Sequence, residues 1–216
     1  MAIDVAQFEE FIKQNFSQNN LPIERCSKIL FSQLAHMPEY GGINHPFQFV
    51  EREIIHLEGL GKTETKPAAP FKKSGKLSGF MHKHFCVPGY EHLGVNANIA
   101  WEFNKSNSKK FSEMALRLAK PYATDGTNTK EELWKYSGEL AHAFVKGPGG
   151  VLDRYANAEA TGDWIIYIVH EKKNYYLCIA KHNQDDFILD ALRHSVPEFL
   201  FLEAVLHSNA PKEHRA

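Results

Sequence analysis

Residues 162–182 restrict the possible folds of this chain more than any other segment. They hold two apolar runs, 164–169 and 175–180, separated by the polar residues 171–174. Both runs are rich in β-branched and aromatic residues, which favour strands, so the segment predicts a β-hairpin. Both faces of this hairpin would be apolar, which is typical of strands in the middle of a sheet. The expected cross-strand pairs are His170 with Tyr175, Ile166 with Ile179, and Asp163 with His182.

Helical periodicity dominates the first part of the chain. Apolar residues recur at helical spacing in residues 5–16 and 22–37, which predicts two helices, whereas residues 47–57 fit a helix or a strand equally well. We expect residues 1–57 to form an N-terminal helical region and residues 58–216 to form an α+β domain, the two packing as one compact unit.

The order of the expected elements indicates an α+β fold. Helices come first, the one clear strand pair (the central hairpin 163–182) is antiparallel, and helical patterns flank it, including one that starts at the capping box Thr129-x-x-Glu132. There is no regular alternation of strands and helices, so a doubly wound sheet is not expected. The predicted architecture is therefore a set of N-terminal helices followed by a small antiparallel sheet with flanking helices.

Composition limits the function classes. The net charge of −1 over 216 residues leaves no basic excess for non-specific nucleic-acid binding, so contact with RNA would need a local basic patch. Cys26, Cys86 and Cys178 stand among apolar residues, which favours free thiols in a reducing compartment. The N-terminus is acidic and no apolar run reaches membrane-spanning length, so we expect a cytoplasmic protein with no membrane partner.

Two histidines fall in a predicted strand beside a basic loop. Residues 58–79 contain five lysines and no apolar periodicity, as loops do, and residues 77–87 alternate like a strand. The alternation places His82 and His84 on one face and Lys83 on the other. Imidazoles serve as general acid and base near neutral pH, and a lysine stabilises charge on a phosphate, which is the chemistry of metal-independent RNA cleavage.

A second polar group lies at the end of the hairpin. Asp163 would face His182 there, with Lys181 adjacent, and a carboxylate in that position holds an imidazole in one tautomer. The catalytic residues that we expect are His82, His84, His92, Lys83, His182 and Asp163. The expected substrate-binding residues are Lys72, Lys73, Lys76 and Lys181.

Other interpretations of these residues remain open. A histidine pair on a strand is also typical of a solvated sheet face, and His82 and His84 could instead ligate a metal together with Cys86 or His92. The chain has no complete ligand motif, so we expect no bound metal and no cofactor. The alternatives to a nuclease are therefore a non-enzymatic module that binds a protein partner and, less well supported by the motifs, a metal-dependent hydrolase.

Residues 79–85, GFMHKHF, resemble the first histidine motif, GF-x-H-x-x-F, of the poly(U)-specific endoribonuclease family. The match places His82 on the family's first catalytic histidine, whereas His92 comes too early to match the second. The layout of helices followed by an antiparallel sheet is also similar to that of the barnase, endoribonuclease and RelE-type toxin group, many of which cleave RNA. This resemblance implies a toxin-like endoribonuclease whose partners are RNA and a protein such as an inhibitor.

Overall fold

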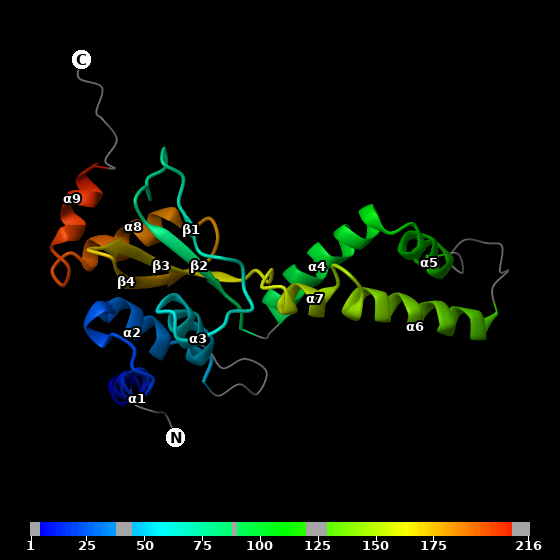
Figure 1. The fold of residues 1–216 in the computed structure, drawn as a ribbon, viewed down its shortest axis with the longest axis horizontal. Coiled ribbons are helices and arrows are strands. Elements are labelled where there is room, and N and C mark those ends of the chain that lie inside the picture. The colour runs from blue at the N-terminus through cyan, green and yellow to red at the C-terminus, as the bar shows by residue number, and fades with distance from the viewer. Residues whose placement is uncertain (1–4, 38–44, 88–89, 120–128, 209–216) are drawn as a thin grey trace, which may run out of the picture. The chain divides into compact units, whose positions relative to one another are not determined.

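The protein folds into helices and one antiparallel sheet, as seen in a computed structural model that describes residues 5–37, 45–87, 90–119 and 129–208 (Figure 1). The predicted α+β class is confirmed. The chain divides into two compact units, the first made of Met1–Pro88 with Thr161–Ala216 and the second of Gly89–Ala160. This division differs from the expected boundary after residue 57, because the N-terminal helices pack directly on the sheet and share a core with it.

The first unit has three layers, with the sheet between two groups of helices (Figure 1). One face of the sheet is covered by the N-terminal helices and the other by the C-terminal helices. The N-terminal group consists of α1 (Val5–Gln18), the short 3-10 helix η1 (Ile23–Arg25), α2 (Lys28–Ala35) and α3 (Phe47–Leu57). The C-terminal group consists of α8 (Asp185–His194) and α9 (Phe201–Ser208).

The sheet has four strands in sequence order, and every neighbouring pair is antiparallel. The strands are β1 (Ala69–Pro70), β2 (Met81–Phe85), β3 (Asp163–His170) and β4 (Lys173–Ala180). The alternation of β3 sends Ile165 and Tyr167 into the core beneath α1–α3, and Ile166 and Ile168 into the core beneath α8 and α9. Both faces of the central hairpin are therefore buried, as its composition predicted.

The register predicted for the hairpin is wrong by one to two residues. The turn consists of only Glu171 and Lys172, both with positive φ (49° and 63°), so that His170 pairs with Lys173. Such turns normally show Asn or Gly, and neither residue is present to signal the turn. A β-bulge at Leu177 shifts the register once more. The observed pairs are Tyr167 with Tyr176 on one side of the bulge, and Ile166 with Cys178 on the other.

The second predicted helix is also shorter than its pattern suggested. A helix was expected over residues 22–37, but only η1 forms near Pro22, and α2 starts after Ser27. Cys26 instead bridges to Tyr176 of β4, and the Ser27 N–H donates to the Tyr176 carbonyl at 2.9 Å. The Ser27 hydroxyl then caps α2 by accepting from Leu30 N at 3.0 Å. Pairing with the sheet therefore divides the apolar pattern into two elements.

The named elements in the described part of the second unit are all helices. They are α4 (Tyr90–Asn107), α5 (Lys109–Ala119), α6 (Lys130–Lys146) and α7 (Val151–Ala156). The predicted capping box is present, since the side chains of Thr129 and Glu132 each accept from the other's backbone N–H at the start of α6. Among the residues that the structure describes, no helix is both long enough and apolar enough to cross a membrane.

We expect Ile166→Ala to lower the free energy of unfolding by roughly 2–5 kcal/mol, because the change leaves a cavity in the core beneath α8. Ile166 has no exposed surface, whereas Val169 on the same strand is 51% exposed, so Val169→Ala is the matched control. Urea denaturation of both variants measures the difference. A loss below about 0.5 kcal/mol for Ile166→Ala would contradict a central position for β3.

Candidate active site

His82 and His84 project from β2 to the same side of the sheet, as the alternation predicted. Their ring centroids are 5.8 Å apart, and both rings contact Trp164 on the neighbouring strand β3, at 4.7 Å and 6.2 Å. The register explains this contact, because Trp164 is the cross-strand partner of His84. Trp164 thus forms a shared surface for the two imidazoles.

His182 joins the same group from the segment that follows β4. Its ring lies 4.2 Å from that of Trp164 and 5.3 Å from that of His84. Phe71, which follows β1, lies on the other side of the group, with its ring 4.9 Å from that of His82. We call His82, His84, His182, Trp164 and Phe71 the histidine cluster.

The carbonyl of Gly162 orients two of these imidazoles. His84 Nδ1 and His182 Nε2 each lie 3.0 Å from the Gly162 oxygen, so both ring N–H groups can donate to it. The Gly162 N–H also approaches His84 Nδ1, at 3.3 Å, but the shorter contact with the Gly162 oxygen favours the tautomer that has its proton on Nδ1. In this tautomer Nε2 can accept a proton. Residue 162 must be glycine here, since a Cβ would lie 1.9 Å from the Phe85 carbonyl oxygen.

Burial keeps His84 and His82 neutral. His84 is only 6% exposed, and its burial, with smaller effects from the charges of His182, His82 and Lys66, lowers its pKa from 6.5 to about 4 despite the bond to Gly162. Burial also lowers the pKa of His82, and the positive form of His182 adds to this effect. His182, in contrast, is exposed.

We expect the low pKa of His84 to make the fold less stable in acid. Between pH 6.5 and about 4, an unfolded chain binds a proton at His84 that the folded chain does not, so stability falls as pH falls through this range. The full loss is roughly 3 kcal/mol. Urea denaturation of the wild type and His84→Asn at several pH values measures it. If the stability of both proteins depended on pH in the same way, His84 would not be the cause of the loss in acid.

Two ring nitrogens of the cluster are buried and have no hydrogen-bond partner among the described residues. These are Nδ1 of His82 and Nε1 of Trp164. A buried polar atom without a partner costs free energy, which is recovered when a ligand or a small movement supplies one. Unsatisfied buried groups of this kind are typical of functional sites, and here two of them lie on rings whose centroids are 4.7 Å apart.

Lys83 does not belong to the histidine cluster, although we predicted it as catalytic. It points to the opposite face of the sheet, where its amine lies 3.0 Å from the carboxylate of Glu53 on α3, and both side chains are fully buried. The amine also donates to the side chains of Thr63 and Thr65 and to the Lys66 carbonyl. Burial lowers its pKa, which the Glu53 charge partly offsets.

Lys66 is a cation near the cluster that the sequence did not single out. Its positive charge acts on His84, and its carbonyl accepts from the Lys83 amine at 2.8 Å. The adjacent Thr65 donates its hydroxyl to the His84 carbonyl at 2.7 Å. Lys83 is therefore a positioning residue that holds this part of the loop beside β2.

The remaining predicted residues are placed differently. Asp163 pairs with Phe85 of β2, and β4 ends at Ala180, so Asp163 does not face His182 across the hairpin as predicted. The register error described above causes this difference. Lys76 forms an ion pair with Asp186 at 2.8 Å, and Lys72, Lys73 and Lys181 are exposed. The side chain of His92 lies outside the described part of the chain.

Within the described ranges, no group of three or more His, Cys, Asp or Glu side chains has an arrangement that could hold a metal ion. The three cysteines are buried, and burial raises the pKa of Cys178 to about 12, so its thiol is not a ready nucleophile. Comparison of the chain with protein-family models, curated proteins and solved structures finds no match.

Proposed function

We propose that the histidine cluster cleaves RNA by acid–base catalysis without a metal. The observation that carries this proposal is the convergence of three imidazoles, two of which are oriented by the single carbonyl of Gly162. Cleavage at a 2′-hydroxyl needs one imidazole that accepts a proton and a second that donates one, held a few ångströms apart. His84 and His182 meet that requirement.

In the proposed reaction, His84 is the base and His182 is the acid. His84 Nε2 takes the proton of the 2′-hydroxyl while the 2′-oxygen forms a bond to phosphorus. The bond between phosphorus and the 5′-oxygen breaks, and protonated His182 gives that oxygen its Nδ1 proton. The products are a 2′,3′-cyclic phosphate and a free 5′-hydroxyl, so atoms and charges balance.

The low pKa of His84 is compatible with this role when substrate is present. A phosphate anion beside the imidazole favours its protonated form and raises its pKa toward the range that suits a general base. The free site, in contrast, keeps His84 neutral and ready to accept a proton. The phosphate anion thus supplies a negative charge, which the histidine cluster lacks and which stabilises the protonated form of His84.

Two further features support binding of a single-stranded nucleic acid. Phe71 and Trp164 are partly exposed aromatic side chains, and their rings meet edge to face at 5.5 Å. Nucleobases stack on such side chains, and unpaired RNA bases are the usual targets. Lys66 adds a positive charge for the backbone phosphate. The toxin-like role and an inhibitor partner stay predictions from the sequence.

The test is cleavage of an unstructured RNA oligonucleotide in the presence of a chelator. We expect cleavage to persist and to leave 2′,3′-cyclic phosphate ends, which mass spectrometry identifies. An oligonucleotide with deoxyribose at each position is the control and should stay intact, because it lacks the attacking hydroxyl. Cleavage that requires an added divalent ion, or a rate equal to that in buffer, would contradict the proposal.

A further inference from the structure

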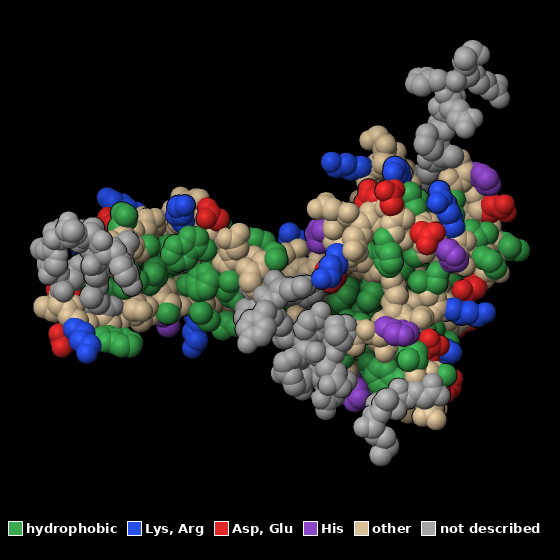
Figure 2. Space-filling view, turned by 180° about the vertical axis from the view of Figure 1, so that it is seen from behind, with side chains coloured by type: hydrophobic (Ala, Val, Ile, Leu, Met, Phe, Trp, Pro, Cys, Tyr) green, Lys and Arg blue, Asp and Glu red, His purple; other side chains and the backbone are tan. Residues whose placement is uncertain are grey.

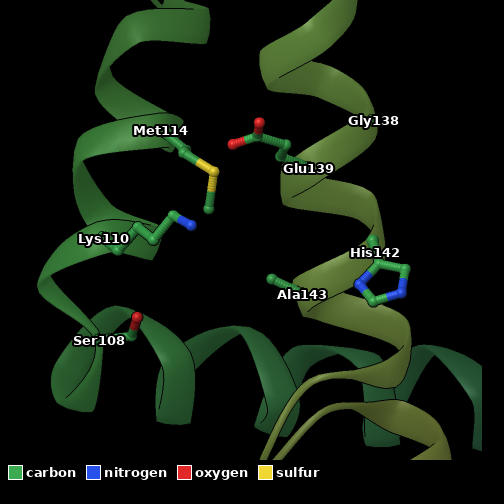
Figure 3. A pocket seen from close by; sticks show the side chains of 7 residues that line it. All are labelled: Ser108, Lys110, Met114, Gly138, Glu139, His142 and Ala143. Carbon is green, nitrogen blue, oxygen red and sulfur yellow. The ribbon is translucent and has the colours of Figure 1, made fainter.

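A groove lies between α5 and α6 in the helical unit, with a volume of about 430 Å³ (Figure 3). Met114 and Ala143 give it apolar walls, and Lys110 and Glu139 extend into it from opposite helices. Gly138 leaves the α6 side open, since an added Cβ there would meet no atom within 4 Å. The groove is large enough for one large side chain with a polar edge.

Helix α6 exposes an aromatic side chain next to this groove. Trp134 is 71% exposed and lies one helical turn before Gly138, while His142 lies one turn after it, so all three share one side of the helix. None of the described side chains of α6 is buried. Figure 2 shows hydrophobic side chains on the surface of this unit, and exposed apolar surface of this kind marks interaction sites.

The charges favour a second copy of the same chain over a strongly charged partner. The second unit contains nine Lys and Arg and nine Asp and Glu, so two copies do not repel each other. The groove itself has one cation, Lys110, and one anion, Glu139, and no ion pair between them is found in the described chain. Both charges can therefore contact a polar aromatic side chain that enters the groove from the other copy.

We propose that this protein forms a two-fold symmetric dimer in which Trp134 of each copy inserts into the α5–α6 groove of the other. A surface that carries both a protruding tryptophan and a groove is self-complementary, as a two-fold interface requires. Each indole would pack on Met114, donate its N–H to the Glu139 carboxylate and receive the Lys110 cation on its face. Tryptophan is the residue most often found at the energetic centre of interfaces.

The test is the oligomeric state of the full chain over a dilution series, measured by sedimentation velocity. The wild type should be a dimer that dissociates on dilution, and Trp134→Ala should raise its dissociation constant at least about tenfold. Leu116→Ala is the matched control, because Leu116 is an apolar residue of α5 with a similar exposure of 67% and does not line the groove. Circular dichroism verifies that both variants keep their helices.

A second pair of variants tests the groove separately from the tryptophan. Gly138→Leu fills the groove and should weaken the dimer as Trp134→Ala does, whereas Gly94→Leu places the same side chain at an exposed, open position of α4 and should not. A wild type that stays monomeric at the highest soluble concentration would overturn the proposal. So would a dimer that survives both Trp134→Ala and Gly138→Leu, since another surface would then form it.

Discussion

His84→Asn is expected to lower the rate of RNA cleavage by roughly 10²–10⁴-fold, the usual contribution of a positioned acid or base. Asparagine retains an N–H group near the position of Nδ1, so it can still donate to the Gly162 carbonyl while it removes the proton acceptor. The folded structure should therefore survive. His182→Asn should have an effect of similar size, because it removes the proton donor.

The control for these variants is His207→Asn, an exposed histidine of α9 that lies 3.7 Å from Glu203 and outside the cluster. The activity of the three variants is measured as the initial rate of cleavage of the same oligonucleotide. If His84→Asn and His182→Asn cleave the RNA at the wild-type rate and have unchanged circular dichroism, the histidine cluster has only a structural role. In a bell-shaped pH–rate profile, the acidic limb reports the base and the alkaline limb reports the acid. The variant that loses the acidic limb would therefore identify the base, and the variant that loses the alkaline limb would identify the acid.

Lys83→Met is expected to lower the free energy of unfolding by about 3–5 kcal/mol, because it leaves the Glu53 carboxylate buried without its cation. One Glu53 oxygen, Oε1, already lacks a hydrogen-bond partner in the described part of the chain, so the site has little capacity to compensate. The ion pair is fully buried, and solvent does not screen it. Urea denaturation of the single variant measures the loss.

The double variant Lys83→Met with Glu53→Leu distinguishes the contribution of the ion pair to stability from the cost of burying a single unpaired charge. Replacing both charges by apolar side chains should recover most of the lost stability, since a buried ion pair and an apolar pair of similar volume often contribute about equally to stability. Lys76→Met is the control, because it breaks an exposed pair with Asp186 and should cost less than about 1 kcal/mol. A loss no larger for Lys83→Met than for Lys76→Met would mean that Lys83 is not ionised in the folded protein.

The hairpin was predictable from composition, whereas its register was not. Runs of isoleucine, valine and tyrosine fill a pleated surface wherever the turn falls, so they identify the strands without fixing the pairing. The register depends on a two-residue turn of Glu171 and Lys172 and on the bulge at Leu177. Neither has a local signal, because the interactions of the whole sheet select these conformations over others.

The candidate site was predictable to the extent that it depends on strand alternation. A period of two places His82 and His84 together and Lys83 opposite, so the pattern already argued against Lys83 as their catalytic partner. His182 reaches the cluster through a loop conformation and not through the cross-strand pairing that we expected. Lys66 was not recognised because tertiary contacts bring its loop to β2, among them the bonds from Lys83 to the Lys66 carbonyl and from Thr65 to the His84 carbonyl.

Strands β2 and β3 are neighbours in the sheet, yet the whole helical unit Gly89–Ala160 lies between them in the sequence. The β3–β4 hairpin closes through two residues, and closing a long loop costs more entropy and takes longer. A nascent chain in which only this hairpin has formed has Trp164 but neither His82 nor His84 beside it. The proposed acid–base pair of His84 and His182 is therefore assembled by the slow, long-range step of folding, and a partly folded chain has no assembled pair.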